Sequence, residues 1–150
     1  MIDRDANRLE VAKRLCATAT IEGCDGKTAG AVMALTAERG VDTAIEAVGI
    51  PATFELCTQI VAPGGTVANV GVHGTKAHLH LENSCDRNVS ITTRLVDTVS
   101  TPMLLNALCS HKINPKLLIT HRFKLDRILD AYETFGHAAD TQALRVIIEA

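Results

Sequence analysis

Two spacings of apolar side chains alternate along the first half of the chain. In some segments the apolar positions recur every three to four residues, which is the period of one helical face. In others, short runs rich in β-branched residues have the length and composition of strands. The pattern predicts, in chain order, a helix over residues 7–15, a strand over 17–21, a helix over 27–39, a strand over 41–48, a helix from Pro51 to about residue 61, and a strand over 66–72.

The order of these segments indicates the fold class. Strands that alternate with helices through short connections form right-handed crossovers and a parallel sheet. Residues 66–72 are nearly all apolar, as expected for a strand covered on both faces. Gly40 suits a helix end, Pro51 suits a helix start, and residues 62–65 (Ala-Pro-Gly-Gly) predict a turn. We therefore expect an α/β fold.

The pattern changes after Gly74, where the chain is expected to leave the sheet over residues 74–87. Either Asp5 or Asn7 is expected to cap the first helix, and Thr101 to cap a later one that has Pro102 at its first position. The second half predicts, in chain order, strands over 76–81 and 89–96, a helix over 101–111, an extended segment over 117–123, a helix over 125–135, and a closing strand over 144–149. We expect residues 1–150 to form one domain.

Composition narrows the classes of function. The chain has 150 residues, of which 47% are hydrophobic, enough for the packed core of one domain. The formal net charge of -2 offers no basic patch for nucleic acid or for an anionic membrane surface. No apolar run approaches the roughly 18 residues of a membrane helix, and the first residues lack an apolar signal segment. We expect no nucleic-acid partner and no membrane association.

The cysteines and histidines do not predict a metal site in this chain. The five cysteines are odd in number, widely and irregularly spaced, and without a C-x-x-C pair: Cys16, Cys24, Cys57, Cys85 and Cys109. We expect reduced, mostly buried thiols in a cytoplasmic protein. His78 and His80 would share one face of a predicted strand, but two ligands are fewer than the three of a catalytic zinc site. An exposed polar strand face is the expected outcome.

Candidate ligand contacts follow from the rule that open parallel sheets bind ligands beyond the carboxyl ends of their strands. Asp3 follows a short apolar start, and its carboxylate is able to accept both hydroxyls of an adenosine ribose while repelling a 2′-phosphate. The alternative is a solvated or helix-capping aspartate. Ala47-Val48-Gly49 and Val70-Gly71-Val72 each end a predicted strand, with glycines that let a ligand or a flat ring approach the backbone. The alternative for both is an ordinary turn.

The order of these motifs is more specific than any one of them. Along the chain it runs Ile-Asp-Arg-Asp-Ala-Asn-Arg-Leu at 2–9, G-V-D-x-x-I-E-A-V-G at 40–49, P-G-G-x-V-x-x-V-G-V at 63–72, Leu-Val-Asp-Thr at 95–98 and I-T-H-R-F at 119–123. In this order the chain resembles the zinc-dependent alcohol dehydrogenases of the medium-chain dehydrogenase/reductase family, and the resemblance covers nearly its whole length.

The resemblance implies an NAD site and assigns residues to it. The residue matching Asp3 binds the adenosine ribose, and the one matching Arg8 flanks the adenosine. Those implied beside the nicotinamide ribose and ring are Ala47, Val48, Gly49, Val70, Gly71 and Val72. Backbone groups matching Leu95 and Val96 face the carboxamide, and a basic residue matching Arg145 approaches the pyrophosphate. A homodimer is also implied, in which residues 89–94 form an edge strand that pairs antiparallel across a twofold axis.

The family's glycine-rich phosphate turn, G-x-G-x-x-G, does not occur in this sequence. We therefore expect a partial Rossmann-type parallel sheet with helices on both faces, lacking the first strand and that turn. Residues 1–150 would then be a truncated nucleotide-binding domain plus the returning carboxyl-terminal segment of a medium-chain dehydrogenase. The family's catalytic domain, with the Cys and His ligands of its zinc, is expected to lie outside this chain. No catalytic and no metal-binding residue is therefore assigned within it.

The sequence predicts a fragment of an NAD-dependent alcohol dehydrogenase, an oxidoreductase that transfers hydride between an alcohol and a nicotinamide cofactor. We expect the fragment to be inactive alone. Asp3 favours NAD over NADP and so argues against the quinone and enoyl reductase branch, which uses NADP without zinc. Two alternatives of another class remain open, a non-catalytic module that dimerises or binds a nucleotide, and a decayed reading frame without function.

Overall fold

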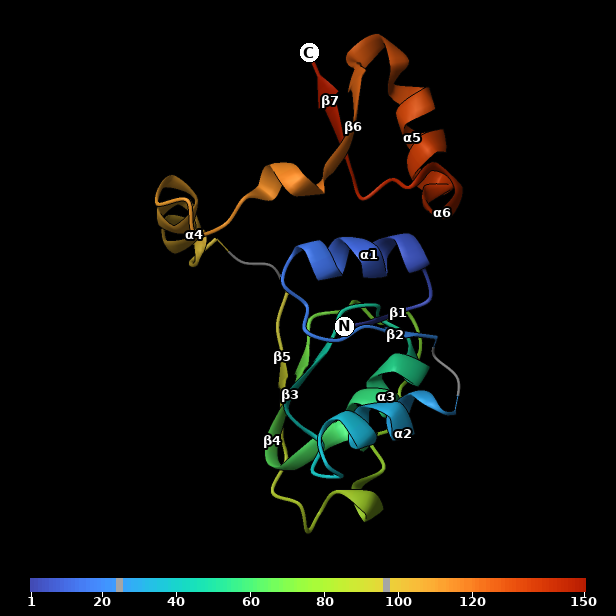
Figure 1. The fold of residues 1–150 in the computed structure, drawn as a ribbon, viewed down its shortest axis with the longest axis vertical. Helices are drawn as coiled ribbons and strands as arrows, with labels where there is room; N and C mark the ends of the chain where they lie inside the picture. Colours follow the sequence, from blue (N-terminus) through green and yellow to red (C-terminus); the bar gives the residue numbers. More distant parts are fainter. Residues whose placement is uncertain (24–25, 96–97) are drawn as a thin grey trace. The chain divides into compact units, whose positions relative to one another are not determined.

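The computed structural model describes residues 1–23, 26–95 and 98–150, which divide into two compact units (Figure 1). The first unit consists of residue 1, residues 3–20 and the described residues from 98 onward. The second consists of residue 2 and the described residues from 21 to 95. Among the described residues, no helix is both long enough and apolar enough to cross a membrane.

The second unit contains a parallel three-stranded sheet. Its elements, in chain order, are β2 (Ile21–Glu22), α2 (Thr28–Leu35), β3 (Val41–Glu46), α3 (Pro51–Ile60), β4 (Val61–Asn69), the 3-10 turn η1 (Leu81–Asn83) and β5 (Ser90–Thr93). The sheet has the order β3-β4-β5 with both pairs parallel, so that Val67 lies opposite Ala44 on one side and Ile91 on the other. The predicted α/β fold with a parallel sheet is confirmed.

The core of this unit lies between the sheet and α2 and α3, which run side by side (Figure 1). Val67 and Val61 of β4 are 0% and 1% exposed. They pack with Val32 of α2 and with the face of α3 that carries Phe54, Cys57 and Ile60. The strands therefore end above a packed core, and the candidate site lies at those strand ends.

The first unit contains a second parallel pair of strands. Its elements are α1 (Ala6–Arg14), α4 (Thr101–Cys109), η2 (Pro115–Leu118), β6 (Ile119–Lys124), η3 (Leu125–Arg127), α5 (Ile128–Gly136), α6 (Ala138–Thr141) and β7 (Arg145–Glu149). β6 and β7 pair in parallel, and α5 packs against both (Figure 1). The short strand β1 (Ile2–Asp3), whose Ile2 belongs to the second unit, forms a two-stranded sheet with β2. Asp5 caps α1 as predicted, accepting hydrogen bonds from the backbone N–H groups of Asn7 and Arg8.

The helix predicted over residues 27–39 ends earlier, at Leu35. The hydroxyl of Thr36 donates to the carbonyls of Val32 and Met33, and Ala37 and Glu38 adopt left-handed conformations with φ of 50° and 62°. Hydrogen bonding of this kind by a side chain competes with the helical backbone ladder. Gly40 does not cap the helix but has φ +85 where the chain enters β3.

Three predicted elements of the second unit are wrong. Residues 62–65, predicted as a turn, belong to β4. They form a bulge there, because the pairing of β3 with β4 shifts register between Val41 and Thr43. The strand expected over 17–21 is displaced to Ile21–Glu22. Residues 76–81 form no strand, because His80 has φ 48 and the leucines of the alternating pattern, Leu79 and Leu81, find no buried face.

Smaller differences affect the edges of the remaining elements. Helix α4 has Ser100, not Thr101, at its N-cap position, and Pro102 stands in its first turn. The strand expected over 89–96 is confirmed for Ser90–Thr93, whereas Val96 lies outside the described residues. The extended segment predicted over 117–123 begins only at Ile119, after the 3-10 turn η2. The helix predicted over 125–135 begins after a further 3-10 turn, η3. The closing strand agrees with its prediction within one residue.

Candidate functional site

Two turns meet at the carboxyl ends of β3 and β4 in the second unit. The first follows Glu46 and carries Ala47, Val48 and Gly49, and the second carries Val70, Gly71 and Val72. Since neighbouring parallel strands end at the same edge of a sheet, the two turns lie together. The backbone N–H groups of Val70 and Gly71 donate to the carbonyl of Glu46, at 2.8 and 3.1 Å. The structure therefore brings six of the predicted contact residues into one group.

The two glycines allow close contact between the turns. Gly49 has φ +87, and a Cβ placed on it would collide with the backbone of Val72. A Cβ on Gly71 would collide with the carboxylate of Glu46 and with the backbone of Gly49. Each turn therefore fills the space that the missing side chain of the other leaves. The approach of a ligand to the outer side of these glycines stays a prediction.

Glu46 is the buried charge of this group. Its side chain is 1% exposed, and its Oε1 accepts hydrogen bonds from the N–H groups of Val48 (2.9 Å) and Gly49 (2.8 Å) and from the hydroxyl of Thr53 (2.7 Å). Burial opposes ionisation, but these three hydrogen bonds and nearby His73 outweigh it, so the pKa of Glu46 is held below its ordinary value. The carboxylate is therefore ionised and anchored at neutral pH.

His73 lies against the second oxygen of that carboxylate. Its Nε2 is 3.3 Å from Oε2 of Glu46 and 2.9 Å from Oδ1 of Asn69. The rings of His73 and Phe54 pack edge to face, with their centroids 6.1 Å apart. Sequence reasoning did not assign Glu46, Thr53 or Asn69 to the site. One signal was available for Glu46, because it shares a strand face with the buried Ala44, where a carboxylate needs partners.

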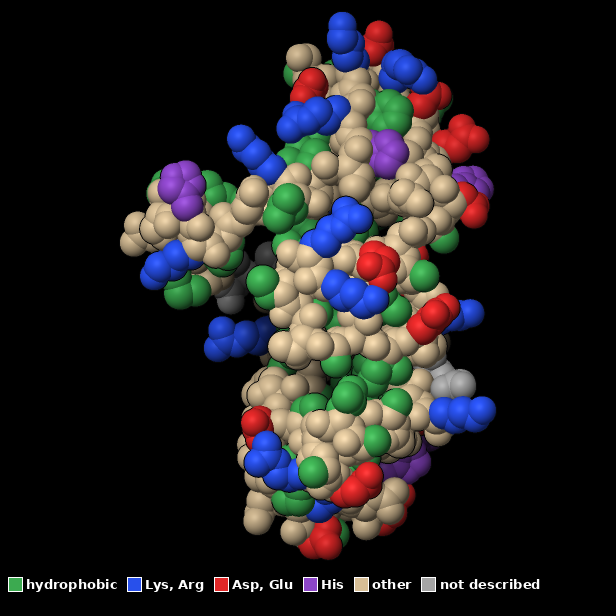
Figure 2. Space-filling model, viewed as in Figure 1, with side chains coloured by type: hydrophobic (Ala, Val, Ile, Leu, Met, Phe, Trp, Pro, Cys, Tyr) green, Lys and Arg blue, Asp and Glu red, His purple; other side chains and the backbone are tan. Residues whose placement is uncertain are grey.

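The outer surface of the two turns is apolar. Val48 is 65% exposed, Val70 51% and Val72 74%, and Ala47 is exposed as well. Exposed apolar side chains also appear on the face of the second unit in view in Figure 2. Single exposed valines are ordinary, but three at one sheet edge form an apolar surface on which a flat ring is able to pack.

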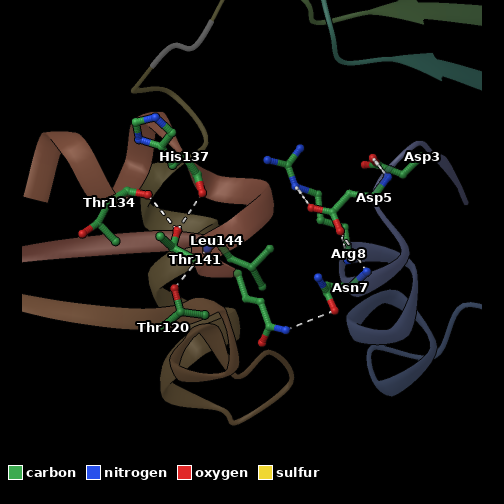
Figure 3. A network of polar contacts seen from close by, with 10 residues as sticks. Asp3, Asp5, Asn7, Arg8, Thr120, Thr134, His137, Thr141 and Leu144 are labelled. Carbon is green, nitrogen blue, oxygen red and sulfur yellow. Dashed lines mark hydrogen bonds and ion pairs between the residues drawn. The ribbon is translucent and has the colours of Figure 1, made fainter.

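The predicted ribose residues belong to the first unit, and Figure 3 shows their contacts. Asp3, half buried, accepts a hydrogen bond from the N–H of Asp5 at 3.0 Å, while Arg8 lies 3.6 Å from the carboxylate of Asp5. Asn7 accepts from the amide of Gln142 at 3.3 Å (Figure 3). Asp5 therefore orients both predicted residues. Their predicted contacts with an adenosine ribose stay predictions.

The remaining predicted contacts are exposed. Leu95, 75% exposed, follows β5 in the second unit, and its partner in the prediction, Val96, lies outside the described residues. Arg145 is exposed at the start of β7 in the first unit, where it lies opposite Ile119. Their contacts with a cofactor stay predictions.

The thiols and histidines differ from their predicted environments. Only Cys57 of the four described cysteines is buried, so the expectation of mostly buried thiols is wrong, because Cys16, Cys85 and Cys109 lie at exposed ends of helices or turns. Burial and the charge of Glu46 raise the pKa of the Cys57 thiol to about 11. His78 and His80 lie off any strand, with ring centroids 5.7 Å apart. Within the described ranges, no three His, Cys, Asp or Glu side chains gather into a group able to hold a metal ion.

Acid is expected to remove the stabilisation that Glu46 contributes. Because its native pKa is lowered, this contribution is complete above the ordinary carboxyl range and is lost as pH falls through the native pKa. The difference in unfolding free energy between the unsubstituted and Glu46→Gln chains should therefore shrink as pH falls from about 7 to below roughly 4. Urea unfolding followed by circular dichroism measures it. Glu55→Gln, which removes a carboxylate of α3 outside the site, is the matched control for loss of charge. A pH-independent difference for Glu46→Gln would contradict the assignment.

Comparisons with known proteins decide the family. The model of the zinc-binding dehydrogenase family matches residues 1–107. The chain belongs to the zinc-binding dehydrogenase family. An alcohol dehydrogenase from Cupriavidus necator is 31% identical over 146 residues, which are 93% of this chain and 39% of that protein. The structure of zinc dependent alcohol dehydrogenase 2 from Streptococcus pneumonia, in its apo form, superposes with a TM-score of 0.95 at 52% identity, covering 99% of this chain and 43% of that one.

A further solved structure, that of a short chain alcohol dehydrogenase from E. coli CFT073 complexed with cofactor NADH, has a TM-score of 0.86 and 22% identity, covering 97% of this chain and 42% of that one. At this identity the similarity shows the fold alone. The chain therefore matches the NAD-binding part of alcohol dehydrogenases and spans about two fifths of the length of the relatives it matches.

Proposed function

We propose that this chain supplies the NAD-binding wall of a zinc-dependent alcohol dehydrogenase and is inactive alone. The observation that carries the proposal is the apolar surface of Val48, Val70 and Val72 on two interlocked turns at the carboxyl end of the sheet. That edge is where open parallel sheets bind nucleotides. The NADH bound in one structural neighbour of the same fold supports the choice of cofactor.

In the proposed enzyme, a bound nicotinamide would supply the hydride-transfer chemistry. The valines of the two turns pack on one face of its ring and exclude water from it, which strengthens polar interactions there. Asp3, held by the N–H of Asp5, accepts the hydroxyls of the adenosine ribose. The described residues offer no group of metal ligands, so no step through zinc is assigned to this chain.

The test is a fusion of this chain to the part of the Streptococcus pneumonia enzyme that precedes the matching segment. The fusion should reduce NAD in an alcohol-dependent way, whereas the chain alone should not. Val72→Asp should lower kcat/KM by at least about tenfold, because a carboxylate would be desolvated against the ring.

The matched control for this test is Leu129→Asp on α5, since Leu129 is 79% exposed and receives the same substitution in the first unit. It should leave kcat/KM within about twofold of the unsubstituted fusion. A fusion without turnover would remove the proposed function. Equal kcat/KM for the Val72 and Leu129 variants would remove the role of the valines.

The edge of the sheet favours a second candidate function, a homodimerising module in the cytoplasm. All four residues of β5 are exposed, and no described strand pairs with its outer edge. The N–H of Arg94 donates to Asn69 on the β4 side, so by alternation the N–H groups of Ile91 and Thr93 point outward. These groups are able to pair antiparallel with the same strand of a second copy.

Sedimentation tests the dimer. The unsubstituted chain should sediment as a dimer, and Thr93→Pro should weaken association at least about tenfold by removing an outward N–H. Thr93→Ala, which keeps that N–H, is the matched control and should remain dimeric. A monomeric unsubstituted chain would exclude this interface.

A further inference from the structure

We infer that Glu46 is the positioning residue of the candidate site, because it bonds both turns that carry the exposed valines. The inference rests on the proposed function only for the claim that those turns face the cofactor. Glu46 itself is buried and carries none of the apolar surface. Its role is to fix the positions of Val48, Val70 and Val72 through hydrogen bonds to the two turns.

The side chain of Glu46 holds the first turn and the start of α3. One carboxylate oxygen accepts from the N–H groups of Val48 and Gly49 and from the hydroxyl of Thr53. The same hydroxyl lies 2.9 Å from the carbonyl of Ile50, just before the helix. Three donors on one oxygen leave the turn little freedom, since the N–H groups of Val48 and Gly49 would lose this acceptor if the turn moved away.

The rest of Glu46 holds the second turn. Its backbone carbonyl accepts from the N–H groups of Val70 and Gly71, and its other carboxylate oxygen faces His73 at 3.3 Å. Asn69 closes the group, because its Oδ1 lies 2.9 Å from the ring of His73 and its amide donates to the carbonyl of Gly71 at 3.2 Å. The close approach depends on Gly71, where any Cβ would displace the carboxylate.

The energetics of burial favour a specific role for this carboxylate. A buried carboxylate is costly unless hydrogen bonds and a nearby positive charge compensate it. An apolar side chain on the same strand face would pack against Phe54 and Cys57 without that cost. An apolar side chain would not accept hydrogen bonds from the backbone of the first turn, whereas the carboxylate of Glu46 does.

Hydrogen exchange on the full chain tests the role directly. Glu46→Gln keeps the shape of the side chain but removes the charge that strengthens its hydrogen bonds. Exchange at the amides of Val48 and Gly49 should accelerate about tenfold, with no comparable change at Val67 in the middle of β4. Glu55→Gln, a matched loss of charge on α3, should leave all of these amides unchanged.

A second variant keeps the test decisive if Glu46→Gln does not fold. Thr53→Val removes a single donor to the carboxylate and should accelerate exchange at the same two amides by about threefold. In the fusion with the Streptococcus pneumonia segment, Glu46→Gln should weaken NADH binding, titrated by its fluorescence, by about tenfold, while Glu55→Gln should not.

The outcomes separate the positioning role from the proposed function. Exchange that accelerates uniformly through β3, β4 and α3, or not at all, would overturn the positioning role. If the unsubstituted fusion binds no NADH while the local exchange pattern is present, the proposed function fails and Glu46 still positions the turns. If the Glu46→Gln fusion binds NADH as tightly as the unsubstituted fusion, the inference fails and the function stands.

Discussion

Gly49→Ala is expected to lower the free energy of unfolding by about 2–5 kcal/mol. The added methyl would occupy a left-handed conformation and would also collide with the backbone of Val72. Backbone atoms on the facing turn yield less readily than the end of a flexible side chain. Urea unfolding followed by circular dichroism measures the loss.

Gly64→Ala separates the two causes. Gly64 has a similar φ of +76, but a Cβ there meets nothing within 4 Å. Gly64→Ala should lower the free energy of unfolding only by the cost of the left-handed conformation, about 1–2 kcal/mol. If the Gly49 and Gly64 variants were equally stable, the two turns would not be in close contact.

Phe54→Ala is expected to lower the free energy of unfolding by about 3–5 kcal/mol. Phe54 is 9% exposed, belongs to the core cluster of the second unit and faces the ring of His73. The cavity left by the ring would lie beside His73, which contacts the carboxylate of Glu46. We therefore also expect faster amide exchange at Val48 and Gly49 in this variant.

Phe135→Ala is the matched control, since the same ring is 55% exposed on α5. Its loss should be below about 1 kcal/mol, because little apolar surface leaves water there on folding. Equal losses for the two variants would show that Phe54 is not part of a packed core.

Much of the fold follows from local signals in the sequence. Pro51 begins α3 and Asp5 caps α1 because each acts on backbone groups within a few residues of itself. The strand predicted over 41–48 forms β3 for a similar reason, although it ends at Glu46 and residues 47–48 belong to the turn. The order of the motifs identified the family, which the matched family model confirms. None of these inferences needed contacts between distant segments.

The site depended on contacts that no local pattern contains. The partners of Glu46 come from the turn after β3, from α3 and from the segment after β4, so only the folded sheet brings them together. The alternation at 76–81 failed for the converse reason, since no described strand pairs with this segment and its leucines are exposed. The sequence alone determined β3, the start of α3 and the family. The tertiary structure decided that Gly49 and Gly71 serve contact between the turns, because hydrogen bonding and steric exclusion act across space, not along the chain.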